Sequence, residues 1–360
     1  MSRPSARFVS RLLALLGGLV VAVLGVELVA RAVSPWPAAD AVRRTSLTGV
    51  LFVPHEELVQ VPRAGAAVTI WDPEYQAHVR FNHMGLRGPE PTPMGPAGRR
   101  VLVVGDSFAL GMQVDEADTF VGLMQSRLSE DRPTQVWNAG VDDYSTWQAH
   151  GRAQELMERG VELDALVLLF YMGNDLVDNL RKRQKRRPDR GQSRPRPLPA
   201  PPSVAMAWIS LITAQWQLAD NPGHRDRLTR EVQLWCDDGA VDMILDATRR
   251  SLADLARTAR RADLPLMVAL APPQIVVEPA AGEALATSLG LTDFDPTRVT
   301  RRVVDVVPRS AHVVDLTEPL QAAARTRRLH LRHDGHWTPA GHAVVADALS
   351  TEILALLEAP

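Results

Sequence analysis

The sequence contains little cysteine, lysine or aromatic residue, and no excess of charge of one sign. Cys236 is the only cysteine among 360 residues, which excludes an intramolecular disulfide framework and a cysteine-based metal cluster. The 40 Lys and Arg residues are balanced by 42 Asp and Glu residues. This balance argues against a nucleic-acid partner, because nucleic-acid-binding proteins usually carry a basic excess. With 5% aromatic residues, the core must be built mainly from Ala, Leu and Val.

One long apolar run is present near the amino terminus. Residues 12–26 contain no charge, and the apolar stretch continues past Glu27 to about Ala30. This length is close to the roughly 20 residues that a membrane-spanning helix needs. Three arginines precede the run, at positions 3, 7 and 11, and the positive-inside rule then keeps the short amino terminus in the cytoplasm. We therefore expect residues 1–34 to be a cytoplasmic stub and a transmembrane signal anchor, with the rest of the chain on the extracytoplasmic side.

Two other interpretations of this run stay open. Ala30-Arg31-Ala32 resembles a signal-peptidase site, so cleavage there would release a secreted protein. A buried core helix of a cytoplasmic protein is the third alternative.

The remaining chain divides by composition. Residues 35–98 mix Pro, Gly and short apolar runs, and we expect a lead-in segment of strands and loops without a core of its own. Residues 99–358 form the main domain. Within it, the segment 181–202 is dense in Arg and has six prolines, which predicts a solvated loop or linker, with polyanion binding as the alternative. Helices are expected near 203–220 and 241–261.

The main domain alternates strand-like and helix-like segments. The apolar runs typical of buried strands are 101–105, 135–140, 165–173, 265–273 and 311–317. Helical patterns follow at 120–128, 147–157 and 339–357. Such alternation predicts an α/β fold, here a flavodoxin-like three-layer sandwich with helices on both faces of a parallel sheet. Ligands on such sheets bind beyond the carboxyl ends of the strands, so those positions hold the candidate site.

Polar residues follow the predicted strands or precede the last helix at four places. These are Gly105-Asp106-Ser107, Asn138-Ala139-Gly140, Gly173-Asn174-Asp175 and His333-Asp334-Gly335-His336-Trp337. Each segment alone is also explained by a turn or a helix cap. Together they supply a nucleophile, a base, an orienting acid and oxyanion donors, which is the set that acyl transfer from an ester requires.

In four blocks the sequence resembles the SGNH (GDSL-type) hydrolase superfamily. The blocks are VLVVGDSFALG, NAGVDDYSTWQ, LLFYMGND and DGHWTPAGH, in this order. FNHMGLRG (81–88) also looks like the segment that precedes the domain in membrane-anchored members. The resemblance implies that Ser107 is the nucleophile, that His336 is the base and that Asp334 orients it. It also implies that the oxyanion hole consists of the Ser107 and Gly140 backbone N–H groups and the Asn174 side chain.

The last block distinguishes His336 from its neighbours and departs from the usual pattern. His330, His333 and His342 compete for the role of base, but the family histidine is commonly followed five residues later by Gly, and His336 with Gly341 fits. Most members have two residues between Asp and His, whereas one separates Asp334 from His336. This D-x-H-W form resembles the subset that includes the alginate and cell-wall O-acetylation proteins. Asp143 stands where many relatives have Gly.

Three functions follow as hypotheses. The first is an anchored extracytoplasmic serine esterase that removes a small acyl group, with acetyl as the expected one, from a glycan or small ester. The second is an O-acetyltransferase that modifies a cell-surface polysaccharide beside a membrane acyltransferase partner. The third is a non-catalytic glycan-binding component that retains the fold. No cofactor or metal is expected, because the histidines lack a spacing such as H-E-x-x-H. Tyr144 and Trp337 are candidate pocket walls, with core packing as the alternative.

Overall fold

A computed structural model provides the fold. It describes residues 6–38, 40–43, 47, 49–180, 199, 203–219 and 221–358. The predicted solvated segment 181–202 therefore lies outside the described residues, apart from Pro199.

The main domain is built on a five-stranded parallel sheet. Its strands lie in the order β10-β9-β8-β6-β7. They span Arg99–Gly105 (β6), Thr134–Asn138 (β7), Ala165–Tyr171 (β8), Leu266–Ala271 (β9) and Ala311–Asp315 (β10). In chain order within the domain this is 2-1-3-4-5, the flavodoxin-like arrangement. The α/β fold class predicted from the sequence is confirmed, and each of the five predicted strands is present.

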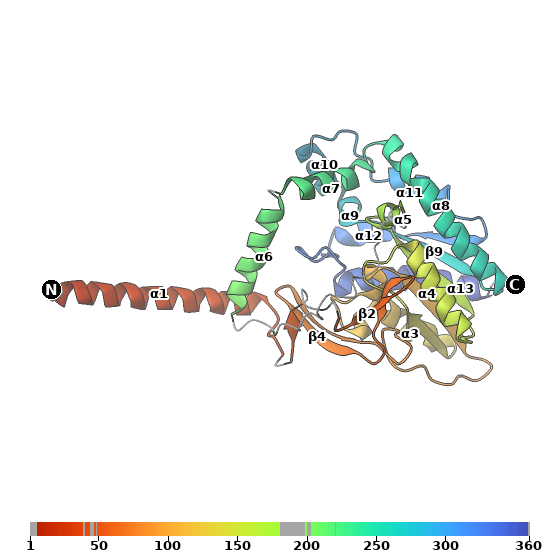
Figure 1. Ribbon diagram of the computed structural model, residues 1–360, viewed down its shortest axis with the longest axis horizontal. Helices are drawn as coiled ribbons and strands as arrows, with labels where there is room; N and C mark the ends of the chain where they lie inside the picture. The colour runs from red at the N-terminus through yellow and green to blue at the C-terminus, as the bar shows by residue number, and fades with distance from the viewer. Residues whose placement is uncertain are drawn as a thin grey trace.

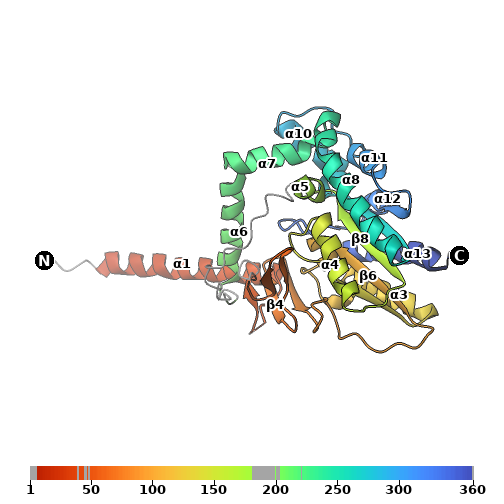
Figure 2. The same ribbon diagram turned by 45° about the vertical axis from the view of Figure 1, so that its right-hand side comes forward.

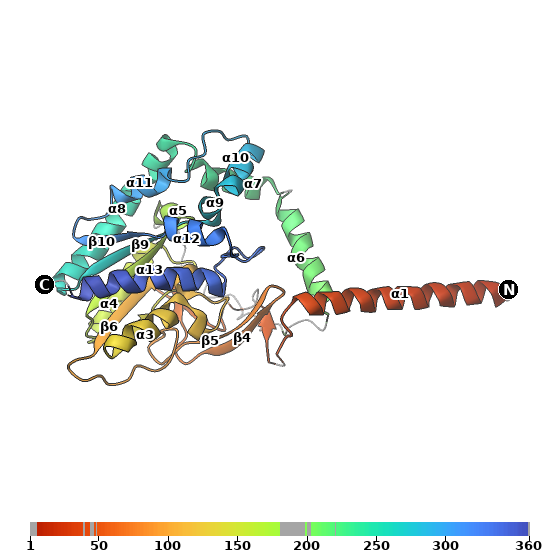
Figure 3. The same cartoon turned by 180° about the vertical axis from the view of Figure 1, so that it is seen from behind.

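Helices cover both faces of the sheet, and strand β6 shows why. Val101 and Val103 point into a core shared with α3, α12 and α13, whereas Leu102 and Val104 point into a core shared with α4, α5, α8 and α11. Such alternation follows from the two-residue period of a strand. Figure 3 shows α3, α12 and α13 on one face, and Figure 1 shows α4 and α8 on the other. These helices span Phe120–Asp131 (α3), Thr146–Glu158 (α4), Asp175–Leu180 (α5), Asp238–Arg261 (α8), Arg298–Val304 (α11), Thr317–Ala324 (α12) and Pro339–Glu358 (α13).

Five further helices complete the description of the domain. They are Ser107–Leu110 (α2), the 3-10 turn Glu116–Asp118 (η2), Pro222–Gln233 (α7), Gln274–Val277 (α9) and Pro279–Ser288 (α10).

The lead-in segment forms two small sheets that pack on the main domain. One sheet has the order β1-β4-β5, and β2 pairs with β3 as an antiparallel hairpin. The strands span Val42–Arg43 (β1), Phe52–His55 (β2), Val59–Pro62 (β3), Ala67–Asp72 (β4) and Tyr75–Arg80 (β5). Their apolar residues share one cluster with Leu110, Met112, Val141 and Tyr144 of the main domain. The lead-in core is therefore continuous with the edge of the domain that carries the candidate site.

Two helices stand apart from this body. Helix α1 (Ala6–Val33) projects away from it, and α6 (Val204–Ala219) runs across the carboxyl end of α1 (Figures 1 and 2). The stretch Leu13–Val33 is long and apolar enough to cross a membrane, and little of it is buried. Helix α13 is also long and apolar enough to cross a membrane, but nearly half of its apolar stretch is buried in the core. By length, composition and exposure, Leu13–Val33 is therefore the candidate for a membrane-spanning helix.

Candidate active site

Ser107 lies in the tight turn between β6 and α2, at the carboxyl edge of the sheet. The strand ends at Gly105, where a Cβ atom would come within 2.7 Å of the Leu169 carbonyl oxygen, so only glycine fits there. Asp106 caps α2 by accepting a hydrogen bond from the Phe108 N–H at 2.9 Å. The sequence G-D-S thus folds as a strand, a glycine turn and a helix start, which presents the Ser107 hydroxyl above the sheet.

His336 and Asp334 reach Ser107 from the loop before α13. The His336 Nε2 atom lies 2.8 Å from Ser107 Oγ, and His336 Nδ1 lies 2.5 Å from Asp334 Oδ1. Phe108 stacks on the His336 ring with a centroid distance of 4.6 Å. With its proton on Nδ1, the imidazole donates to Asp334 and can accept the Ser107 proton at Nε2. The one-residue spacing between Asp334 and His336 is therefore compatible with a carboxylate–imidazole–hydroxyl chain.

The three competing histidines lie elsewhere. His330 and His342 are each 1% exposed in the core. Burial lowers the pKa of His330 to about 4 and that of His342 to about 3, so both are neutral near neutral pH. His333 faces α6, where its ring packs edge-on against Trp208 and its Nδ1 lies 2.8 Å from Gln215 Oε1. Among these candidates, only His336 contacts Ser107.

The predicted oxyanion donors surround the same turn, and one of them already has a hydrogen-bond partner. Gly140 packs so closely on α2 that a Cβ atom would lie 2.4 Å from the Leu110 nitrogen. Its N–H donates to Asn138 Oδ1 at 3.0 Å. The Asn174 amide lies near enough to Asp106 to lower the pKa of that carboxyl. An oxyanion would therefore have to share the Gly140 N–H with Asn138.

Asp106 is a buried acid beside the catalytic chain. Burial raises its pKa from 3.8 to about 7, against the opposing effects of the Phe108 N–H, the nearby His336 and the Asn174 amide. The side chain is 1% exposed. From the sequence, Asp106 was predicted only as part of a turn, because the string G-D-S gives no sign that the pKa of its acid is shifted.

Two further residues that hold the catalytic acid were missed from the sequence. Gln113 donates from Nε2 to Asp334 Oδ1 at 3.2 Å. Glu74 lies in the turn between β4 and β5, and its carboxylate accepts from the backbone N–H groups of Arg332, His333 and Asp334 at 2.8, 2.8 and 3.0 Å. More than 200 residues separate each partner from this loop, so no local pattern could have revealed either contact.

The two candidate pocket walls are buried. Trp337 is 0% exposed and packs edge-on against Phe108 and Phe120. Tyr144 is also 0% exposed, and its hydroxyl donates to the Gln60 carbonyl oxygen at 2.6 Å in the core shared with the lead-in segment. The structure therefore places both in the packing that supports the site, which was the alternative interpretation. In the part of the chain that the structure describes, no three His, Cys, Asp or Glu side chains lie close enough to hold a metal ion.

The parallel sheet carries a serine after its first strand and a His–Asp pair before its last helix, which is the arrangement that the resemblance to SGNH-type hydrolases implies. Residues 238–359 match the family model described as "SGNH hydrolase-like domain, acetyltransferase AlgX". This match covers the last third of the chain, including Asp334 and His336 but not Ser107, and it confirms the resemblance to the SGNH superfamily. A comparison with curated proteins gives no match.

Solved structures to which the chain is similar include TesA and two proteins described as esterases. TesA is 15% identical with a TM-score of 0.41, over 72% of this chain and 99% of that one. A variant of an acetyl xylan esterase from Geobacillus stearothermophilus is 15% identical with a TM-score of 0.41, over 71% of this chain and 95% of that one. The psychrotrophic esterase EstA from Pseudoalteromonas sp. is 14% identical with a TM-score of 0.40, over 72% of this chain and 100% of that one. Sequence identities and TM-scores this low carry no information on the substrate of this protein.

Proposed function

We propose that the protein is a membrane-anchored serine esterase, with its catalytic domain on the extracytoplasmic side, that removes a small acyl group from a glycan or small ester. The observation that carries this proposal is the continuous chain from Ser107 Oγ through His336 to Asp334, with links of 2.8 and 2.5 Å. A hydroxyl that is hydrogen-bonded to an oriented imidazole is an activated nucleophile.

The proposed reaction has two steps. His336 Nε2 takes the Ser107 proton as the oxygen attacks the ester carbonyl, and the Ser107 and Gly140 N–H groups and Asn174 hold the oxyanion. His336 then protonates the leaving alcohol, and the acyl group remains on Ser107. In the second step His336 activates water, which attacks the acyl-enzyme, and the serine leaves as the free hydroxyl. Asp334 stabilises the imidazolium that forms in both steps.

The amino-terminal helix supports the location. The stretch Leu13–Val33 is exposed and apolar, and arginines at positions 3, 7 and 11 precede it. By the positive-inside rule this orientation puts the amino terminus in the cytoplasm and the sheet on the other side. Extracytoplasmic glycans are then the acylated polymers within reach of the site.

An O-acetyltransferase is the second candidate, and two observations favour it. The family model that matches residues 238–359 is described as an acetyltransferase. The loop that carries Asp334 also meets α6, the helix that crosses the carboxyl end of the proposed membrane anchor, since neighbouring His333 contacts Trp208 and Gln215 of α6. In this reaction a polysaccharide hydroxyl would replace water in the second step, and a membrane acyltransferase partner would supply the acetyl group.

The test uses the full-length protein in detergent, with a chromogenic acetyl ester and an acetylated polysaccharide as substrates. We expect wild type to release acetate, and Ser107→Ala to reduce the rate by roughly 10³-fold or more. Ser126→Ala is the matched control, because Ser126 lies exposed on α3 and donates only to its own helix at Gly122. Intact-mass analysis should detect one acetyl adduct in wild type and none in Ser107→Ala.

The fate of that adduct separates the candidates. Loss of the acetyl group to water supports the esterase. An adduct that persists until a polysaccharide is added, and then appears on the polymer, supports the transferase. A folded wild-type protein with neither adduct nor acetate release would contradict both and would leave the non-catalytic glycan-binding role.

A further inference from the structure

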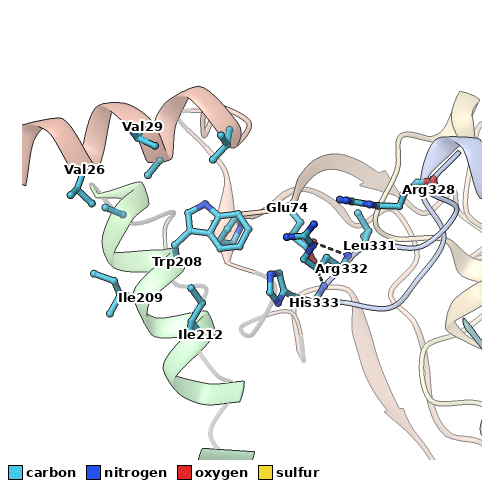
Figure 4. A pocket seen from close by; sticks show the side chains of 15 residues that line it. Val26, Val29, Glu74, Trp208, Ile209, Ile212, Arg328, Leu331, Arg332 and His333 are labelled. Carbon is cyan, nitrogen blue, oxygen red and sulfur yellow. Dashed lines mark hydrogen bonds between the residues drawn. The ribbon is translucent and has the colours of Figure 1, made fainter. Parts of the chain in front are cut away.

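A cavity of about 790 Å³ lies between the membrane helix, α6 and the catalytic loop. Figure 4 shows its two unlike walls. One wall is apolar and comes from α1 and α6: Val26, Val29, Val33, Trp208, Ile209 and Ile212. The other wall comes from the loop that leads to the catalytic acid, and it includes Arg328, Arg332 and His333. We call this space the anchor cavity. Its volume is in the range of ligand-binding pockets.

Hydrogen bonds fix the joint between α1 and α6. Glu27 accepts from the Ser203 hydroxyl and from the backbone N–H groups of Val204 and Ala205 at 2.8, 3.0 and 3.0 Å. Trp208 Nε1 donates to Ser34 Oγ at 2.6 Å. Four hydrogen bonds therefore hold α6 at its angle to α1, and the cavity lies between the two helices.

Helix α6 has the character of a helix that lies along a membrane surface. It runs across the end of α1 (Figure 1), and Met206 and Trp216, which do not line the cavity, are 58% and 71% exposed. An exposed apolar face that includes a tryptophan is typical of interfacial helices. With α1 in the bilayer, α6 and the anchor cavity lie at the level where lipid headgroups meet the hydrocarbon.

The basic wall carries a net positive charge, because its two arginines outnumber Glu74. Among the described residues, neither Arg328 nor Arg332 forms an ion pair with a carboxylate, and both are exposed. Glu74 also lines the cavity, but its carboxylate already accepts three backbone N–H groups. Guanidinium groups bind phosphate in a bidentate manner, and basic pockets at the membrane surface bind anionic lipids.

We propose that the anchor cavity binds an anionic phospholipid of the outer leaflet, with its phosphate between Arg328 and Arg332 and its acyl chains against α1 and α6. This inference rests on the membrane location in the proposed function, but not on the chemistry of Ser107. The lipid would join the anchor, α6 and the loop that carries Asp334 in one binding site. The catalytic edge of the sheet would thereby be held toward the bilayer surface.

The test is native mass spectrometry of the full-length protein in detergent, titrated with phosphatidylglycerol or phosphatidylcholine. We expect tighter binding of phosphatidylglycerol, and an affinity at least about tenfold weaker in Arg328→Gln/Arg332→Gln, since each charge-assisted hydrogen bond contributes on the order of a factor of ten. Arg325→Gln/Arg327→Gln is the matched control, because these exposed arginines lie on the same segment outside the cavity. The control should bind as wild type does.

A second pair of variants tests the apolar wall. Val29→Trp should fill the cavity and reduce lipid retention, whereas Val21→Trp, at a similarly exposed position of α1 outside the cavity, should not. Equal binding of the two lipids, or equal loss in both arginine pairs, would overturn the proposal. Binding of soluble glycerol phosphate as tight as that of the lipid would overturn it as well. Ser107→Ala should retain the lipid, so failure of the catalytic proposal can be told apart from failure of this one.

Discussion

At the scale of single residues, the site depends on a carboxylate that performs no chemistry. The Glu74 carboxylate accepts hydrogen bonds from three successive backbone N–H groups, those of residues 332 to 334. These N–H groups would otherwise point away from any regular element, because the loop has no helix or strand ladder to pair with. Glu74 therefore provides the hydrogen bonds that a helix or strand would otherwise provide. These bonds fix the backbone of the loop from which the Asp334 side chain reaches His336. We interpret it as a positioning residue.

The substitution Glu74→Gln should lower kcat by about tenfold with little change in KM, because the amide replaces one acceptor by a donor that opposes an N–H. A less well-held Asp334 should also shift the acid limb of the pH–rate profile, which a purely structural role would not move. Steady-state kinetics across pH on the acetyl ester would measure both effects. Glu57→Gln, at an exposed lead-in position, is the control. A wild-type kcat in Glu74→Gln would refute the positioning role.

At the scale of elements, α2, the helix that begins at Ser107, is only four residues long. A side chain from the lead-in segment stabilises it. Arg87, which is 4% exposed, donates from Nη1 to the carbonyl oxygens of Leu110 and Gly111 and from Nη2 to that of Val114. Burial lowers the pKa of Arg87 to about 10, so the side chain remains charged at neutral pH. One guanidinium from the lead-in segment thus satisfies the open carboxyl end of α2 and the turn that follows it.

Replacing Arg87 by Met should destabilise the fold by about 3 to 5 kcal/mol, because it removes three buried charge-assisted hydrogen bonds and leaves the Leu110 and Gly111 carbonyl oxygens with only their longer bonds, at 3.5 and 3.3 Å. For a domain of this size that is a fall in Tm of roughly 10 °C. Thermal unfolding followed by circular dichroism would measure it. Arg80→Met should change stability by less than about 1 kcal/mol, because Arg80 is half exposed and its 3.6 Å ion pair with Glu116 is screened by water. Equal effects of both changes would refute the role of Arg87.

These same elements show how far the sequence could predict the structure. The five strands and most helices could be predicted because buried apolar runs and glycine turns are local signals. Ser107 and His336 were predicted only from four sequence blocks taken together and their resemblance to the SGNH hydrolases. Arg87 and Glu74 could not be found, because their partners are backbone atoms far along the chain. Hydrogen bonds to backbone groups leave no residue pattern. The buried positions of Tyr144 and Trp337 were equally inaccessible, since they depend on how segments distant in the sequence pack together.

At the scale of the whole molecule, the edge of the sheet that carries the candidate site is linked through α6 to α1, the proposed membrane anchor. The carboxyl ends of the strands point toward the loop at residues 330 to 337, and this loop meets α6, which is bonded to α1 through Glu27. A soluble esterase needs no such connection. The arrangement suits a substrate or acyl donor held at the bilayer surface, and it gives a physical reason for an anchor beyond retention of the protein.

The buried titratable groups around the site predict opposing effects of pH on stability. Asp106 has its pKa raised from 3.8 to about 7, so between these values the unfolded chain loses a proton that the folded protein keeps, and stability falls as pH rises. His330 and His342 have their pKa values lowered from 6.5 to about 4 and 3, so stability falls as pH decreases through the same window. The two histidines together outweigh the single acid, and wild type should lose stability toward acid.

Two isosteric variants separate these contributions. Asp106→Asn retains a capping side chain but removes the acid, so Tm between about pH 4 and 7 should rise more steeply with pH than in wild type. His342→Asn keeps an acceptor for the Phe120 N–H, which lies 3.2 Å from Nδ1, and should make the profile flatter. Loss of packing alone would lower Tm at every pH without changing the slope. If the folded protein keeps Asp106 protonated and His342 neutral across this window, the slope of Tm against pH changes in opposite directions in the two variants. Tm profiles parallel to that of wild type would contradict this prediction.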